Sequence, residues 1–117
     1  MCVFNVCVLI QNMRLGIDAV GAAGGIVEAA VCYTGDISDK SREQYNLDYY
    51  LEFARQLNGL GIHVLAIKDM AGLLKPAAAT TLVSALRGEF PDLPIHVHTH
   101  DTAGTGVASM IAAARVN

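Results

Sequence analysis

The sequence predicts an α/β fold in which helices pack over a parallel sheet. Short apolar segments alternate with longer segments of helical spacing along all 117 residues. The apolar segments are rich in Val, Ile and Ala and show little polar alternation, as strands buried on both faces do. Hydrophobic residues make up 53% of the chain and charged residues 16%, a composition that suits such burial.

Four strand–helix units follow one another along the chain. The strands are expected at residues 3–10, 26–33, 62–67 and 95–100, and the helices at residues 12–22, 47–57, 76–87 and 106–115. A stripe of Met13, Ile17 and Val20 indicates the first helix. Asp48 lies near the start of the second helix, and Pro76 is the residue type favoured at the start of the third.

Four such units fit either a small open sheet or half of an eight-stranded barrel. A full (β/α)8 barrel needs about 250 residues, and this chain stops directly after the last expected helix. We therefore favour a partial (β/α)8 TIM barrel with about four β–α units and parallel strands. On this interpretation residues 1–117 are a fragment of a larger barrel domain.

Composition and charge argue against several classes of function. The net charge is −3 and the chain has no Trp, so nucleic acid and anionic membranes are not expected partners. No apolar run reaches the roughly 18 residues of a membrane span. The three cysteines form no CxxC pair, which indicates a reducing compartment. The apolar N-terminal run lacks a basic leader, and no transit peptide is expected in this chain.

Ionisable side chains gather where two of the expected strands end. Lys68 follows one strand, and His98 and His100 end another. Residues two apart on a strand share a face and lie about 6.6 Å apart, so the two histidines can lean onto one metal ion. Barrels of this type place their sites at the C-terminal strand ends. His96 shares the face but lies about 13 Å from His100 along the strand, and we interpret it as part of a polar core layer.

Lys68 has two interpretations from the residues alone. An apolar run delivers its amine to a strand end, where burial disfavours the charged form. A neutral amine can act as a nucleophile or take up CO₂ as a carbamate, which is an anionic oxygen ligand. The simpler interpretation is an ion pair with Asp69 or Asp101, and without further context it is preferred. The charged loop over residues 36–44 and Lys75 are interpreted as solvated.

Longer motifs resemble the carboxyltransferase domain of the pyruvate carboxylase family. The resemblance runs from about Asn12 to the C-terminus, and its motifs are long and specific. It rests on residues 33–36 (Tyr-Thr-Gly-Asp), 45–47 (Tyr-Asn-Leu), 67–76 (Ile-Lys-Asp-Met-Ala-Gly-Leu-Leu-Lys-Pro) and 90–102 (Phe-Pro-Asp-Leu-Pro-Ile-His-Val-His-Thr-His-Asp-Thr). The Phe-Pro-Asp-Leu-Pro run is closer to the eukaryotic than to the bacterial enzymes.

The resemblance implies a biotin-dependent transfer of a carboxyl group from carboxybiotin to pyruvate, giving oxaloacetate. The family's carbamylated, metal-binding lysine corresponds to Lys68, and its two metal histidines correspond to His98 and His100. The implied metal is manganese or zinc, and Lys68 is also the candidate catalytic residue. The biotin is carried on a domain outside this chain. The resemblance further implies a homo-oligomer, located in the mitochondrial matrix if the protein is eukaryotic and in the cytoplasm otherwise.

The N-terminal end departs from the family pattern. The family's Arg-Val-Phe-Asp-Ser-Leu-Asn-Tyr run should precede Asn12, but its arginine, aspartate and tyrosine align with Cys2, Asn5 and Leu9. We therefore expect residues 1–11 to be divergent and carry over neither substrate binding nor proton transfer to them. The family's remaining aspartate ligand and its catalytic threonine belong to strands expected outside this chain.

Other functions stay open from the sequence. Oxaloacetate decarboxylase and transcarboxylase subunits share the lysine motif, and the chain can also be interpreted as a non-catalytic, truncated partner of the full enzyme. Metal-dependent lyases and Claisen synthases share a His-x-His-Asp-Thr-x-Gly strand end. They are disfavoured because they lack the carbamylated lysine.

We expect the isolated 117-residue chain to have no carboxyltransferase activity, because it carries only Lys68, His98 and His100 of the implied site. The check is an assay for oxaloacetate formed from pyruvate by the purified chain. Measurable oxaloacetate would contradict the expectation.

Overall fold

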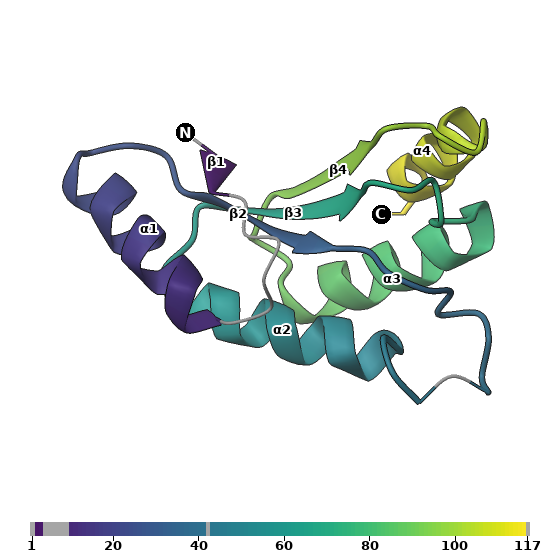
Figure 1. Ribbon diagram of the computed structural model, residues 1–117, viewed down its shortest axis with the longest axis horizontal. Coiled ribbons are helices and arrows are strands. Elements are labelled where there is room, and N and C mark those ends of the chain that lie inside the picture. Colours follow the sequence, from purple (N-terminus) through teal and green to yellow (C-terminus); the bar gives the residue numbers. More distant parts are fainter. Residues whose placement is uncertain (1, 4–9, 42, 117) are drawn as a thin grey trace.

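The computed structural model describes residues 2–3, 10–41 and 43–116 and shows a parallel sheet with helices against it (Figure 1). Within this part of the chain the strands lie in the order β1-β2-β3-β4, each parallel to its neighbour. The elements are β1 (Cys2–Val3), α1 (Ile10–Ala22), β2 (Glu28–Cys32), α2 (Leu47–Gly59), β3 (Val64–Asp69), α3 (Pro76–Glu89), β4 (Ile95–Thr99) and α4 (Gly106–Ala114). The predicted α/β fold with four β–α units is confirmed.

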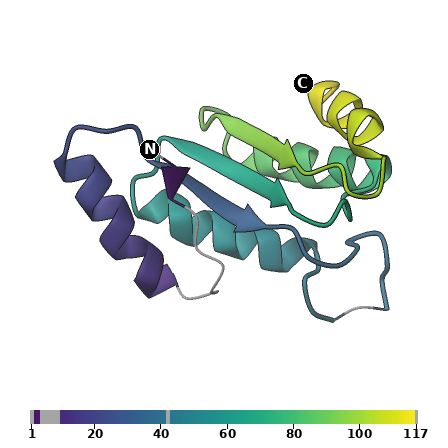
Figure 2. The ribbon, with the colours of Figure 1, turned by 45° about the horizontal axis from the view of Figure 1, so that its top comes forward.

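The helices divide the sheet into a covered and an open face. Strands β2 to β4 lie in front of α2 and α3 in Figure 2, and none of the described helices covers the face turned to the viewer. Helix α4 packs on α3 beyond the end of β4 (Figure 1). None of the described helices is long and apolar enough to cross a membrane.

Side chains along the strands alternate between buried apolar residues on the covered face and polar or small residues on the open face. Side chains on the covered face are almost fully buried: Ala29, Val31, Leu65 and Ile67 are 0–3% exposed. They pack against the apolar stripes of the helices, which include Ala54 and Leu57 of α2 and Ala78, Leu82 and Leu86 of α3. The open face carries polar side chains with small residues between them, and it holds the candidate site described below.

Two element boundaries differ from the prediction in ways that matter for the site. Strand β3 continues through Lys68 to Asp69, because its pairing with β4 and β2 extends that far: the Lys68 carbonyl accepts the Tyr33 N–H at 2.8 Å. Strand β4 ends at Thr99, so His100 lies one residue beyond it. Lys68 is therefore fixed by strand hydrogen bonds, whereas His100 stands on the loop that follows.

The predicted strand at residues 3–10 is wrong at its end. Ile10 opens helix α1, two residues before the predicted start, because the apolar stripe of Met13 and Ile17 extends back to Ile10, which packs against the same core. Residues 4–9 of that predicted strand lie outside the described residues. Val3 pairs with Ala29 in β1.

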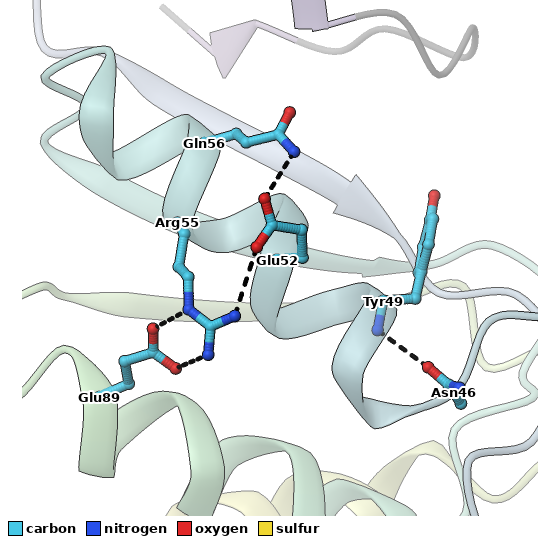
Figure 3. Close-up of polar contacts among 6 residues, drawn as sticks. All are labelled: Asn46, Tyr49, Glu52, Arg55, Gln56 and Glu89. Atoms are coloured by element: carbon cyan, nitrogen blue, oxygen red, sulfur yellow. Dashed lines mark hydrogen bonds and ion pairs between the residues drawn. The ribbon is translucent and has the colours of Figure 1, made fainter.

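Polar contacts fix helix α2 at its start and against α3 (Figure 3). Asn46 caps the helix, since its Oδ1 accepts the Tyr49 N–H at 2.9 Å. Arg55 of α2 makes a two-point contact with Glu89 of α3, with Nη2 3.0 Å from Oε2, and a weaker one with Glu52 in its own helix. Because Arg55 is half exposed, this cluster orients the two helices more than it stabilises the fold.

Replacing Leu82 with Ala should lower the free energy of unfolding by about 2–5 kcal/mol, because Leu82 is 0% exposed between α3 and the sheet. The control is Leu15→Ala at a position that is 78% exposed, which should change it by less than about 0.5 kcal/mol. Urea denaturation of both variants checks the difference. Equal losses would contradict the described packing.

Candidate functional site

The C-terminal ends of β3 and β4 bring Lys68 and His98 side by side. The two residues are register partners in the parallel pair, so their side chains share the open face. The ring of His100 lies next to the ring of His98, with centroids 5.1 Å apart and planes at 77°. The three residues singled out from the sequence therefore occupy one edge of the sheet. Lys68 and His98 are half-buried there, and His100 is exposed.

The two imidazoles can hold a divalent metal only if further ligands join them. Within the described ranges no three His, Cys, Asp or Glu side chains form a metal-binding group. Zinc binds imidazole nitrogen at about 2.1 Å, which puts two rings on one tetrahedral ion about 5 Å apart, centre to centre. The ring centres of His98 and His100 lie 5.1 Å apart in an edge-to-face contact, a spacing that allows such a pair. Lys68 is the register partner of His98 on the neighbouring strand, and a carbamate on its amine would offer the kind of oxygen that zinc and manganese accept.

His96 lies on the same face but is occupied by another contact. Its Nδ1 is 2.6 Å from Oε1 of Glu28, two strands away on β2. The pair spans the central strand above Ala66, which is only 1% exposed although it faces away from the helices. Small residues in the middle strand thus allow a polar contact across the sheet, one repeat below His98.

The acidic residues considered as partners of Lys68 are engaged elsewhere with backbone groups. Asp69 follows Lys68 and therefore points to the opposite face, where its two carboxylate oxygens accept the N–H groups of Leu73 and Leu74. Asp101 accepts the Gly106 N–H at 2.6 Å and so caps α4. It holds a positive φ of 51° to do so.

A tyrosine pair supports the loop that follows β2. Tyr33 is 2% exposed, and its ring stacks on that of Tyr50 with centroids 5.3 Å apart, so it packs in the core. The Tyr50 hydroxyl donates to the Thr34 carbonyl at 2.6 Å and accepts the Thr34 N–H at 2.8 Å. Burial raises the pKa of both phenols, so both stay neutral at physiological pH.

An ion pair ties the loop after β2 to the start of α3. Lys75 Nζ lies 2.6 Å from Oδ2 of Asp36. The hydrogen bond from Lys75, with one from the Ser38 N–H, lowers the pKa of the Asp36 carboxyl. The interpretation of Asp36 as merely solvated is therefore wrong, because the fold brings it into contact with Lys75, 39 positions away. Lys75 itself is exposed, as predicted. Arg42, in the same loop, lies outside the described residues.

Sequence reasoning missed the contacts that hold the site's loops together. Ser109 of α4 is 1% exposed and donates to the Leu74 carbonyl at 2.5 Å, in the turn that follows β3. Asp69 and Gly72, three residues apart between two apolar segments, are residue types that favour a turn. No local signal marks Ser109, since its acceptor lies 35 residues away.

The sequence and the fold match one protein family. The family model described as HMGL-like covers residues 12–116, and the chain belongs to that family. It is 58% identical to the proteins named mitochondrial pyruvate carboxylase of Rattus norvegicus and Homo sapiens, over 113 residues in each case. It is equally similar, at 58%, to pyruvate carboxylase of Komagataella pastoris.

Solved structures give the same result. The carboxyl transferase domain of Rhizobium etli pyruvate carboxylase with pyruvate matches 99% of this chain with a TM-score of 0.94 and 47% identity. The same domain with pyruvate and biocytin matches 98% of it, again with a TM-score of 0.94, at 48% identity. The predicted membership of the carboxyltransferase fold is confirmed, with this chain as a part of the barrel.

The chain spans only a part of these relatives. It covers 9–10% of the length of the curated pyruvate carboxylases cited above, and 19–20% of the two solved carboxyl transferase chains. The expectation that residues 1–11 are divergent stays a prediction.

The Asp36–Lys75 pair should stabilise the fold only where Asp36 is ionised. Its pKa in the folded state is lowered, so the contribution is complete above the unfolded value of about 3.9 and is lost as the pH falls through the lowered folded value. Lys75→Met should therefore cost up to about 1 kcal/mol at pH 7 and nothing at about pH 2.

The measurement is urea denaturation at the two pH values, with Lys40→Met in the exposed part of the same loop as the matched control. A Lys75→Met effect that is independent of pH would show that the ion pair is not its cause.

Proposed function

We propose that this chain is part of the carboxyltransferase domain of a biotin-dependent pyruvate carboxylase, which moves a carboxyl group from carboxybiotin to pyruvate and gives oxaloacetate. One observation carries the proposal. A chain that superposes on the Rhizobium etli domain with a TM-score of 0.94 also has Lys68, His98 and His100 together at adjacent strand ends. The relatives cited above are named pyruvate carboxylases, which favours carboxylation over the decarboxylase and transcarboxylase alternatives.

In this proposal Lys68, as a carbamate, and the imidazoles of His98 and His100 are ligands of one divalent metal, manganese or zinc. A metal held by these residues would act as a Lewis acid toward the pyruvate carbonyl. The two histidines must be neutral to bind it, and Lys68 must be a neutral amine to take up CO₂.

The chain's own contribution is to orient these ligands before substrate arrives. Lys68 and His98 stand on paired strands, so their separation is set by the sheet and not by a flexible loop. Helices α2 and α3 cover the opposite face of the sheet (Figure 2), and Lys68 and His98 lie near the C-terminal strand ends, where barrels of this type hold their sites.

Further parts of the machinery belong to the longer protein. We propose that biotin arrives on a carrier domain outside this chain and that the full enzyme is a homo-oligomer. The animal relatives named mitochondrial support a place in the mitochondrial matrix if this protein is eukaryotic. These proposals about carboxyl transfer, the biotin carrier and the location are drawn from relatives of which this chain matches one part.

Lys68→Ala, His98→Ala and His100→Ala should each lower the metal content of the full-length protein by at least tenfold and abolish oxaloacetate formation from pyruvate, ATP and bicarbonate. Each substitution removes one of the few ligands that hold the ion. Elemental analysis and a coupled oxaloacetate assay check the two results. His96→Asn, at a residue on the same face that contacts Glu28, is the control for metal content and should keep the wild-type level.

Two results would contradict the proposal. Lys68→Ala with full metal content and full activity would remove Lys68 from the site. Oxaloacetate consumption without any ATP-dependent synthesis would move the protein to the decarboxylase class.

A further inference from the structure

We propose that Asp69 is a positioning residue that fixes Lys68 relative to His100, and that Ser109 holds Asp69's turn in place from α4. This inference rests on the proposed function, because it concerns the geometry of the proposed metal ligands. It is carried by a continuous set of short contacts between the loops after β3 and β4.

The Asp69 carboxylate closes the turn directly after Lys68. Its Oδ1 accepts the Leu73 N–H at 2.9 Å and its Oδ2 accepts the Leu74 N–H at 3.0 Å. The residue is 2% exposed, and burying a carboxylate is costly unless hydrogen bonds replace its water. Two charge-assisted bonds to backbone N–H groups do so here, and they bring the chain sharply back towards the strand that carries Lys68.

The main chain of the same residue holds the other ligand segment. The Asp69 carbonyl accepts the N–H of His100 at 3.1 Å, so His100 is fixed although it lies beyond the end of β4. The Thr102 hydroxyl adds a longer bond of 3.3 Å to the Met70 carbonyl. Asp69 therefore contacts both loops: its side chain binds the turn after β3, and its carbonyl binds the segment after β4.

The two loops also touch without room for a side chain between them. A Cβ on Gly72 would lie 2.7 Å from the Ala103 backbone nitrogen, and Gly72 has a φ of +68°. The turn that Asp69 closes is thus seated directly on the segment after His100. A shift of this turn would be transmitted to both proposed ligands.

Ser109 binds the end of this turn at Leu74. Its hydroxyl is 2.5 Å from the Leu74 carbonyl, and Leu74 is the residue whose N–H binds Asp69. Ser109 belongs to α4, whose first turn is capped by Asp101, next to His100. The contacts therefore run from Ser109 through Leu74 to Asp69, and they link α4 to the backbone beside Lys68.

The substitutions Asp69→Asn and Ser109→Ala separate this role from simple packing. An Asn side chain keeps the size of Asp but has only one oxygen, so an NH₂ group would face one of the two leucine N–H groups. Ser109→Ala removes only the hydroxyl and leaves the helix propensity favourable. The matched controls are Asp92→Asn and Ser84→Ala, at exposed positions outside the described loops.

The test uses the full-length protein with its metal removed and Co²⁺ added as a visible probe of coordination. Both Asp69→Asn and Ser109→Ala should keep the wild-type far-ultraviolet circular dichroism. Both should weaken Co²⁺ binding about 10- to 100-fold, and Asp69→Asn should change the intensity of the d–d absorption, since a displaced ligand changes the coordination. The two controls should match the wild type.

The outcomes separate this inference from the function on which it rests. Wild-type affinity and spectrum in both Asp69→Asn and Ser109→Ala, with a wild type that binds Co²⁺, would overturn the positioning role alone. If Asp69→Asn fails to fold, Ser109→Ala still decides the question, because wild-type binding in it would overturn the inference. A wild type that takes up no Co²⁺ would overturn the proposed function, and the inference with it.

Discussion

The parallel pairing of β3 with β4 is the constraint on which the rest of the site depends. It aligns Lys68 with His98 and extends to Asp69 and Thr99, so two chemically different side chains meet on one face at a distance set by the sheet. The same pairing leaves Asp69 on the opposite face, towards the helices. Because successive side chains of a strand point to opposite faces, the proposed ligand Lys68 and the supporting Asp69 lie on opposite sides of the sheet.

The helices support the site mainly through side chains that hold the loops at the strand ends in place. Helix α2 carries Tyr50, which anchors the loop after β2, and α4 carries Ser109, which anchors the turn after β3. An ion pair between Asp36 and Lys75 connects these two loops in turn. Polar contacts thus link the loops at the C-terminal edge of the sheet, whereas the opposite end combines apolar packing with the bond from the Val27 N–H to His63 and the His96–Glu28 contact.

Much of this arrangement could be predicted from the sequence, because it depends on local periodicity. The period of two placed His98 and His100 together, and the alternation of apolar and helical segments gave the parallel sheet. Two kinds of feature could not be predicted from the sequence. The extension of β3 through Lys68 and Asp69 depends on pairing with β4. The polar residue pair Lys68-Asp69 gives no sign in the sequence that the strand continues through it. The contacts of Ser109 and Asp36 join residues 35 and 39 positions apart, so only the folded chain reveals them.

The approach of Gly72 to Ala103 limits how this edge of the sheet can change during evolution. The atom nearest to an added Cβ is a backbone nitrogen, so no replacement of the Ala103 side chain would make room for it. A substitution at position 72 would be tolerated only with a different course of the partner loop. The course of the loop after β4 therefore restricts position 72 to glycine, and the two loops can change their paths only together.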